Sequence, residues 1–238
     1  MVIRVYFFPK WLIQAVVIFL CGLLAAGAVW LFLGGQEASV MAEPVYQGTN
    51  TEQKVALAVN VDWGEDILPS MLDTLEKERV TATFFVTGRF AEKFPELVEQ
   101  IAAAGHEIGN HGYKHPHPDE LSVEQNQKDI TQAERILEKL TGTKPVLYAP
   151  PYGEHGKTCL TAAEQCGYTT ILWTLDTIDW EKPAPSHETL VARASGDKLT
   201  SGAIILMHPK EHTAEALADI IHAIQAKGYQ CTKVSDVL

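Results

Sequence analysis

The chain has 238 residues, which is enough for one domain with a sizeable buried core, or for one domain and an appendage. Its formal net charge is -11, and the sequence has no cluster of basic residues that could neutralise phosphates. Both observations argue against nucleic acid as a partner. The four cysteines show no C-x-x-C spacing, so neither a disulfide framework nor a cysteine zinc site is indicated.

The first element in the chain is a long apolar segment at residues 11–33. It carries one amide, Gln14, and no charge. As a helix it would extend about 34 Å, which is enough to cross a bilayer. Lys10 precedes the segment and Glu37 follows it, so the positive-inside rule places residues 1–10 in the cytoplasm. The sequence therefore predicts a single-pass anchor in the cell membrane with an extracytoplasmic domain.

A cleaved signal peptide is the competing interpretation of this segment, because residues 40–42 offer a small-residue cleavage site. The apolar run is longer than in an ordinary signal peptide, which favours a retained anchor. Residues 34–53 mix Gly, Pro and polar residues without apolar periodicity, as in a linker. The globular domain is expected at residues 54–238, outside the cytoplasm under either interpretation.

Within this domain, short apolar runs typical of buried strands alternate with longer amphipathic stretches typical of helices. The predicted strands are 55–61, 83–86, 146–148, 169–172 and 203–207. The predicted helices are 69–78, 94–104, 123–140, 157–166, 188–194 and 213–226. Ser122 and Gln125 form a capping box for the longest helix. This alternation requires parallel strands joined by crossover helices, in an open doubly wound sheet or in a barrel.

The polar residues decide between these two architectures, because they fall just past five successive strand ends. They are Asn60 and Asp62, His111 after a short strand at 107–109, the residues around Pro150, Asp176 and His208. A β/α barrel gathers functional groups at the carboxyl ends of many strands, whereas an open sheet concentrates them at one switch point. The distribution favours a barrel.

His111 and His115 lie four residues apart, so one helical turn could direct both imidazoles to one metal ion. The alternative is a polar loop with solvated histidines. Two histidines rarely suffice for a metal. A carboxylate is the usual third partner in a hydrolytic site, and Asp62 at a strand end can supply it.

The segment His111-Gly-Tyr-Lys-His115-Pro resembles the H-x-x-x-H-P metal motif of the polysaccharide deacetylases, carbohydrate esterase family four. Four more segments resemble motifs of this family in the same order: ATFF at 82–85, PPYG at 150–153, WTLDTIDW at 173–180 and LMH at 206–208. The resemblance covers residues 54–238. It implies a distorted β/α barrel that removes acetyl groups from N-acetylglucosamine residues of peptidoglycan or a chitin-like polymer. The anchored layout is similar to that of sporulation-associated members.

The resemblance also implies a divalent metal, most often zinc, held by Asp62, His111 and His115. In the family the metal polarises the acetamide carbonyl and activates a water molecule, and a carboxylate accepts the proton of this water. His208 would protonate the departing amine, and Asp176 would hold the imidazolium. The plainer alternatives are a loop cap for Asp176 and a core position for His208.

The resemblance assigns the substrate walls to Tyr152, Trp180 and Pro151, with a backbone N–H of the 151–153 turn facing the oxyanion. A plain core position is the alternative for Trp180. Nothing in the sequence determines the oligomeric state.

The first motif departs from the family, in which two adjacent aspartates act as base and metal ligand. Here the sequence reads AVNVDWG at 58–64, with a single carboxylate. When the family pattern is aligned on Pro69 and on the ATFF segment at 82–85, Asn60 falls at the base position and Asp62 at the ligand position. Residues two apart in a strand share a face, which supports this register. The alternative register, aligned on Gly64, makes Asp62 the base and puts Trp63 at the ligand position.

An asparagine amide cannot accept a proton at neutral pH. General-base help, typically worth about a hundredfold to ten-thousandfold, is then absent or comes from Glu65 or Asp66. Ala149 stands where the family has an arginine that pairs with the base, and losing both avoids a buried unpaired charge.

Three functions follow from these departures. The first is an N-deacetylase attenuated at Asn60. The second is a catalytically weak or inactive glycan-binding relative that acts as a membrane-held cell-wall factor. The third is a sugar-binding barrel without a metal.

Overall fold

The computed structural model describes residues 9–12, 14–15, 18–20, 22, 43–49 and 52–238. The chain divides into two compact units, residues 1–40 and 41–238, and the second unit contains the predicted domain. Among the described residues, no helix has the length and apolar character needed to span a membrane. The predicted anchor at 11–33 falls largely outside these residues and stays a prediction.

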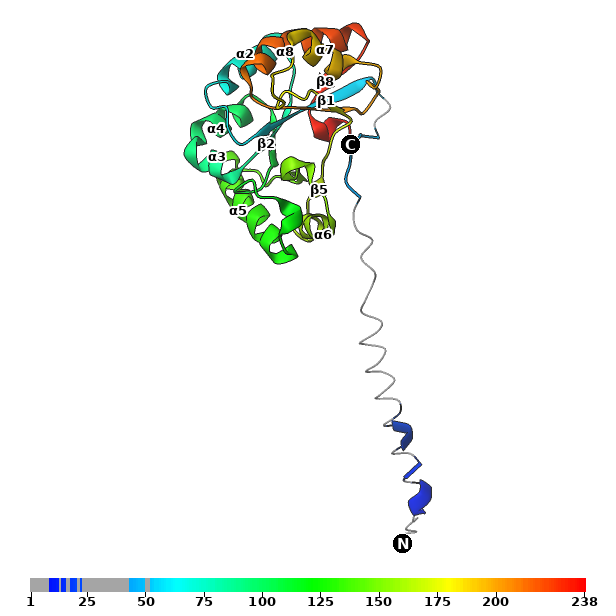
Figure 1. The fold of residues 1–238 in the computed structure, drawn as a ribbon. Helices are drawn as coiled ribbons and strands as arrows, with labels where there is room; N and C mark the ends of the chain where they lie inside the picture. The colour runs from blue at the N-terminus through cyan, green and yellow to red at the C-terminus, as the bar shows by residue number, and fades with distance from the viewer. Residues whose placement is uncertain (1–8, 13, 16–17, 21, 23–42, 50–51) are drawn as a thin grey trace, which may run out of the picture. The chain divides into compact units, whose positions relative to one another are not determined.

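Eight parallel strands form one sheet in the described part of the domain (Figure 1). Their bounds are β1 Lys54–Val61, β2 Thr83–Val86, β3 Glu107–Asn110, β4 Leu147–Tyr148, β5 Thr169–Thr170, β6 Leu175–Asp176, β7 Ile204–Met207 and β8 Gln230–Thr232. The order is β5-β4-β3-β2-β1-β7-β6, and β8 pairs with the start of β1. Strand β1 is therefore the centre of the sheet.

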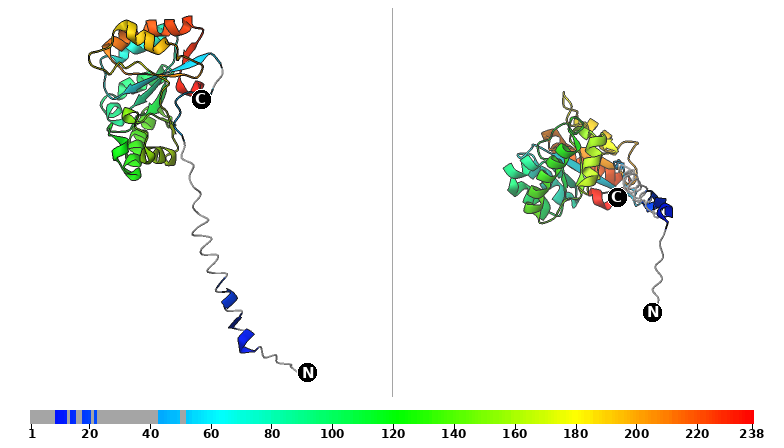
Figure 2. Two further views of the ribbon diagram at one scale, coloured as in Figure 1. Left: turned by 45° about the vertical axis from the view of Figure 1, so that its right-hand side comes forward. Right: turned by 90° about the horizontal axis from the view of Figure 1, so that it is seen from below.

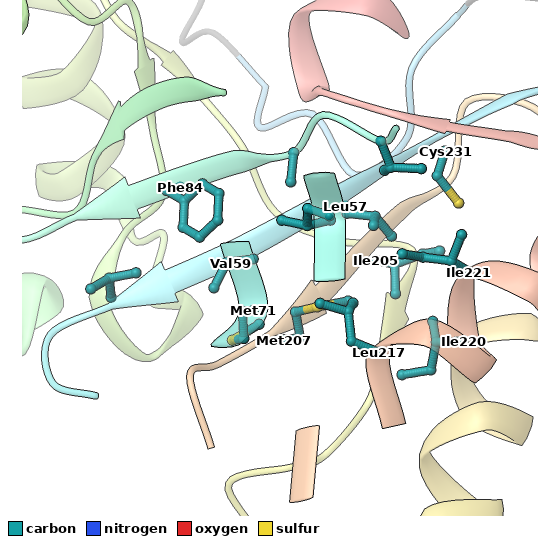
Figure 3. Close-up of a cluster of buried hydrophobic side chains, with 14 of the residues drawn as sticks. Leu57, Val59, Met71, Phe84, Ile205, Met207, Leu217, Ile220, Ile221 and Cys231 are labelled. Atoms are coloured by element: carbon teal, nitrogen blue, oxygen red, sulfur yellow. The ribbon is translucent and has the colours of Figure 1, made fainter. Parts of the chain in front are cut away.

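Strand β1 is almost fully buried because both of its faces are covered, as is usual for a parallel sheet. Leu57 and Val59 point to the helix-covered side, where they meet Met71, Ile205 and Leu217 in the main core (Figure 3). The alternate residues Ala56 and Ala58 face the interior of the curved sheet and pack in a second, smaller core with Phe85 and Ile204. Small side chains on this inner face leave room for Phe85.

The helices lie around the outer side of the sheet (Figures 1 and 2). Their bounds are α2 Leu68–Glu78, α3 Gly88–Lys93, α4 Pro95–Ala103, α5 Val123–Thr141, α6 Lys157–Gln165, α7 His187–Ser195 and α8 Glu211–Ala226. Three short 3-10 helices are Pro118–Glu120, Pro151–Gly153 and Val234–Asp236. The predicted capping box of α5 is confirmed, since Ser122 and Gln125 cap reciprocally.

The five predicted strands and six predicted helices all appear, with ends shifted by a few residues. Strand β5 ends at Thr170 rather than 172, because Ile171 forms a bridge with Val45 instead. Sequence analysis missed α3, β6 and β8. These elements have six, two and three residues, which is too short for a hydrophobic period to be visible.

The predicted barrel is a half-barrel. In the described part of the chain, β5 and β6 end the sheet and do not pair with each other. Residues 43–49, within the predicted linker, run along this side: Val45 N donates to Thr170 O at 2.8 Å and Gly48 N donates to Gly202 O at 2.8 Å. The strands therefore all present their carboxyl ends on one side of a curved, incompletely closed sheet.

Candidate active site

A cleft of about 570 Å³ opens at the carboxyl ends of the strands. Most of its lining residues come from the ends of β1, β3, β4, β6 and β7 and from the loops that follow them, whereas Arg89 comes from the start of α3 and Trp173 from the loop before β6. They are Asn60, Asp62, Trp63, Arg89, His111, Lys114, His115, Tyr152, Gly153, Trp173, Asp176, Trp180, Leu206 and His208. All of the predicted site residues except Pro151 are in this set, so the structure brings them together at one edge of the sheet.

The end of β1 directs Asn60 and Asp62 to the cleft and Val61 to the main core, as expected for residues that alternate along a strand. Asn60 is only 6% exposed. Its Oδ1 is the one buried side-chain oxygen or nitrogen in the described part of the chain that has no hydrogen-bond partner. Such an atom carries the cost of its lost hydration, so a ligand that donates a hydrogen bond here would be bound favourably.

Asp62 is held by two residues from the start of α3. Thr87 Oγ1 donates to Asp62 Oδ1 at 2.8 Å, and the same Thr87 caps α3 by accepting from Phe90 N at 3.3 Å. Arg89 Nε donates to Oδ1 at 2.6 Å, and a second guanidinium nitrogen donates to Oδ2. Both oxygens of the Asp62 carboxylate are thus bonded to the two-pronged guanidinium.

His111 is buried, and its Nδ1 lies 2.6 Å from the carbonyl oxygen of Ala149. Because a carbonyl only accepts, Nδ1 carries the hydrogen and Nε2 is left with its lone pair. Burial, together with the nearby His115, lowers the His111 pKa to about 3, so the ring is neutral at pH 7. A backbone carbonyl that orients the imidazole in this way is the common outer partner of metal-binding histidines.

The ring of His115 lies 4.9 Å from that of His111, centroid to centroid, with 76° between the planes. Burial lowers the pKa of His115, and the charge of Asp62 opposes this shift. His115 has a positive φ of 56°, a conformation that is costly for a residue with a Cβ. The backbone is therefore strained at His115, the residue whose ring lies beside that of His111.

The predicted zinc ligands meet the requirements of a metal only in part. The two imidazoles are neutral and close together, which suits a metal. The carboxylate is not available, because Arg89 is bonded to both of its oxygens. In this arrangement, no group of three side chains within the described residues could hold a metal ion.

The prediction that Asp176 is the anionic partner of His208 is wrong. The partner is Asp179, whose Oδ1 lies 2.7 Å from His208 Nδ1. Asp179 Oδ2 also accepts from His208 N at 2.7 Å and from Thr213 Oγ1 at 2.8 Å. Asp179 is only 1% exposed, so this carboxylate is fully used inside the protein.

Asp176 instead stabilises the loop in which Asp179 lies. Its Oδ1 accepts from Ile178 N at 2.7 Å and its Oδ2 from Trp180 Nε1 at 3.3 Å. Ile178 has a positive φ of 54°, and the chain turns inward there toward Asp179. The sequence offers two aspartates three residues apart, and only this turn decides which one reaches His208.

Aromatic rings form the walls of the cleft. Trp63 stacks on His208 with a centroid distance of 5.8 Å and 9° between the planes. Tyr152 meets His115 edge to face at 4.6 Å and stacks on His117 at 4.0 Å. Tyr152 and Trp180 are 58% and 51% exposed, so both rings can contact a ligand.

Pro151, predicted as a substrate contact, is buried and does not line the cleft. It begins the short turn that holds Tyr152 at a positive φ of 59°. In the same turn, Gly153 N donates to Pro150 O at 3.1 Å. This N–H is therefore engaged within the turn and does not point a free donor at a ligand.

Sequence analysis missed three contributors to the site: Arg89, Asp179 as the partner of His208, and the stacked position of Trp63. Arg89 lies 27 positions from Asp62 and carries no local motif. The signal for Trp63 was only its place beside Asp62. These contacts depend on how separate strand ends meet.

A parallel half-barrel with two histidines and a His–Asp pair at its strand ends defines a class of carbohydrate-modifying hydrolases. The family model described as polysaccharide deacetylase matches residues 47–171. The chain belongs to this family, which comprises hydrolases of N-acetyl amide bonds and their relatives.

Relatives and solved structures agree with this placement. The chain is 40% identical over 200 residues to the protein YlxY of Bacillus subtilis, covering 84% of this chain and 62% of YlxY. It is 35% identical over 190 residues to a peptidoglycan-N-acetylglucosamine deacetylase of Bacillus cereus, covering 77% of this chain and 68% of that one. The crystal structure of a CE4 family pseudoenzyme from Bacillus anthracis matches with a TM-score of 0.78 and 35% identity, over 82% of this chain and 69% of that one. The chain thus spans less than two thirds of YlxY.

Proposed function

We propose that the domain binds N-acetylated cell-wall glycan in the cleft and deacetylates it slowly or not at all. The observation that carries this proposal is Asn60. It occupies the predicted base position at the end of β1, it is buried, and its Oδ1 has no partner among the described residues. The cleft therefore offers a hydrogen-bond acceptor for a ligand in place of a proton acceptor for water.

In the register that puts Asn60 at the base position, neither Glu65 nor Asp66 replaces the missing base. Asp62 is the predicted metal ligand in this register, and it is bonded to Arg89 through both oxygens. Glu65 lies 3.9 Å from Lys93, and neither Glu65 nor Asp66 lines the cleft. Without a general base, the rate of water attack falls by about a hundredfold to ten-thousandfold.

The absence of a charged partner at residue 149 is consistent with this proposal. Ala149 is buried, and its carbonyl oxygen serves to orient His111. In the family an arginine at this position pairs with the base, so here it would be a buried charge with no carboxylate at Asn60 to pair with, which is costly. An uncharged residue at position 60 and an uncharged residue at position 149 are therefore compatible, because neither leaves a buried charge without a partner.

Peptidoglycan is the proposed source of the glycan. The relatives from Bacillus cereus, and PdaA of Bacillus subtilis with 31% identity over 195 residues, are named as peptidoglycan deacetylases of N-acetylglucosamine and N-acetylmuramic acid, respectively. The exposed faces of Tyr152 and Trp180 suit the apolar faces of sugar rings. A chitin-like polymer carries the same acetamide groups and is the comparison ligand.

The pseudoenzyme structures support weak turnover. A mutant of that pseudoenzyme is 33% identical to this chain, and the match covers 82% of this chain and 71% of the mutant. The mutant is described as having restored enzymatic activity. A protein of this family can thus keep the scaffold of an enzyme while lacking turnover. We infer the same condition for this chain from Asn60 and Ala149.

A second candidate, an active N-deacetylase, is favoured by the complete His208–Asp179 pair. A buried carboxylate that accepts from Nδ1 orients the imidazole, whose other ring nitrogen could pass a proton to a departing amine. The proposed metal is zinc, and Asp62, His111 and His115 are its proposed ligands, once Asp62 is free of Arg89.

Acetate release separates the two candidates. Purified full-length protein is incubated with peptidoglycan or with chitooligosaccharide, with and without added zinc, and glycan binding is measured in parallel. We expect binding with little release in the native chain, and at least about tenfold more release in the Asn60→Asp, Ala149→Arg double variant, since a base is regained. Loss of that gain in a triple variant that adds His208→Ala would assign it to this cleft. Release by the native chain that equals or exceeds that of the double variant would favour the second candidate.

We also propose that residues 11–33 anchor the chain in the cell membrane, with the domain on the outer side where peptidoglycan lies. The uncharged apolar run and the basic residues before it support this orientation. Protease treatment of intact cells should digest the domain and leave the first ten residues protected. Protection of the domain in intact cells would contradict the proposal.

A further inference from the structure

The loop of residues 112–114, which joins the two histidines of the cleft, is bonded to a carboxylate on α5. Tyr113 N donates to Asp129 Oδ2 at 2.8 Å, and Lys114 N donates to Asp129 Oδ1 at 3.1 Å. Hydrogen bonds to an ionised acceptor are about twice as strong as those between neutral groups. Because each oxygen accepts from one of two successive N–H groups, the carboxylate fixes the direction of the backbone as well as its position.

Gly112 is suited to this contact in two ways. Its φ of 75° lies in the left-handed region that favours glycine, and a Cβ at this position would collide with Asp129 Oδ2. Its own N–H donates to Oδ1 of the buried Asn110 at 2.8 Å. Side-chain oxygens therefore accept from three successive N–H groups of the loop.

The carbonyl groups of the same loop bind the start of α3. Gly88 N donates to Gly112 O at 2.9 Å, and Arg89 N donates to Tyr113 O at 3.0 Å. The guanidinium of Arg89 is in turn bonded to Asp62, so the loop also supports that ion pair. The loop thus connects α5 with the arginine side of the cleft.

Two cleft residues, Lys114 and His115, lie at the end of this loop and directly after it. The ring of His115 meets Tyr152 edge to face at 4.6 Å and so supports an exposed wall of the cleft. We propose that Asp129 is a positioning residue for glycan binding, which does not line the cleft itself and acts by holding the loop. Its effect on glycan affinity rests on the proposed function, whereas its hold on the loop does not.

The strained backbone of His115 explains why such a hold is needed. His115 has a φ of 56°, and a conformation of this kind persists only where the surrounding structure holds it. The N–H group of Lys114, one residue earlier, is bonded to Asp129. Without the carboxylate, we expect His115 to relax toward an ordinary conformation and its ring to leave the position beside Tyr152.

Asp129→Asn is the sharpest variant, because it keeps the size of the side chain and replaces one acceptor by a donor. The new NH₂ group would face one of the two backbone N–H groups, and two donors cannot bond each other. If the positioned loop then makes up about a tenth of the population, the dissociation constant for glycan becomes about tenfold weaker. Isothermal titration of the full-length protein with soluble peptidoglycan fragments measures this ratio.

Glu138→Gln is the matched control, since Glu138 is an exposed carboxylate on α5 and does not line the cleft. It should leave glycan affinity unchanged. Unchanged affinity in Asp129→Asn would overturn the proposal, as would an equal loss in both variants.

A double-mutant cycle with His115→Ala separates positioning from a general loss of stability. If Asp129 acts through His115, the affinity loss of the double variant is smaller than the product of the two single losses. A fold that is merely destabilised gives independent losses, which multiply. Losses that multiply would therefore overturn the positioning role.

Amide hydrogen exchange tests the hold on the loop without a ligand and in the native chain. The N–H groups of Tyr113 and Lys114 should exchange at least about tenfold more slowly than in an unstructured peptide, since each is bonded to a charged acceptor. In Asp129→Asn at least one of them should become about tenfold faster. Exchange of both groups at the unstructured rate in the native chain would overturn the proposal. Protected amides in a native chain that binds no glycan would instead contradict the proposed function, and with it the effect on affinity, but not the hold of Asp129 on the loop.

Discussion

The two sides of the cleft differ in how well their polar groups are satisfied. On the β7 side, Asp179 accepts three hydrogen bonds and holds His208 from within the core. On the β1 side, Asn60 has a buried oxygen without a partner in the described structure. One side of the cleft thus keeps a fully satisfied buried carboxylate, whereas the other carries an uncharged amide with one unsatisfied oxygen.

The physical reason lies in burial. A buried carboxylate with three donors is stable only as a complete set, because removing one member leaves the others unpaired. An amide at the base position costs less, since it carries no net charge and can be satisfied by a ligand. Replacing Asp179 is therefore expected to cost more stability than placing an amide at residue 60.

The largest expected effect is on the complete side. Asp179→Ala should lower the free energy of unfolding by about 3–5 kcal/mol, because His208 and Thr213 lose their buried acceptor. Asp176→Ala, which removes acceptors from a more exposed loop, should cost about 1 kcal/mol. Denaturant unfolding of both variants measures this difference. Equal losses in the two variants would show that the buried bonds of Asp179 stabilise the fold no more than the loop bonds of Asp176.

The next effect concerns Asn60, the uncharged residue at the end of β1. Asn60→Asp alone should destabilise the fold at pH 7 by about 1–3 kcal/mol, because a carboxylate would be buried without a cationic partner. Adding Ala149→Arg should recover part of this loss, with a coupling energy of about 1–3 kcal/mol in a double-mutant cycle. Additive effects of the two substitutions would show that residues 60 and 149 do not pair.

A smaller effect appears on mild acidification in the presence of a chelator. The folded-state pKa of His111 is lowered to about 3 from its ordinary 6.5. Between pH 6.5 and pH 3, His111 is therefore protonated in the unfolded chain and neutral in the folded chain. Stability is fully present above pH 6.5 and falls as the pH drops toward 3, by about 1 kcal/mol between pH 6.5 and pH 5.5 for this one group. Unfolding at both pH values should show a smaller difference for His111→Gln, and an unchanged difference would contradict the assignment.

The smallest effect tests the exposed wall that both halves share. Trp180→Ala should weaken glycan binding about threefold to tenfold, corresponding to about 0.5–1.5 kcal/mol of ring stacking. Its stability should stay within about 0.5 kcal/mol of the native chain, because half of the ring is already exposed. Isothermal titration with a chitooligosaccharide measures the affinity. Unchanged affinity would remove Trp180 from the binding wall.

Much of the fold is predictable from local patterns. The capping box of α5 is visible in the sequence because its two bonds join residues three positions apart. Asn60 and Asp62 share the cleft because side chains alternate along β1, and the same alternation sends Val61 to the core. The family motifs fall at strand ends because the carboxyl ends of parallel strands meet at one edge of the sheet.

The amino-acid sequence by itself determined the alternating elements, the edge of the sheet at which the polar residues gather, and the presence of an amide rather than a carboxylate at residue 60. Only the tertiary structure decided that Asp179 rather than Asp176 holds His208, and that Arg89 holds Asp62. Hydrophobic period and residue spacing report local geometry along one strand or helix. The choice among competing charged partners depends on distances between segments far apart in the chain, and these distances exist only after the strands have come together.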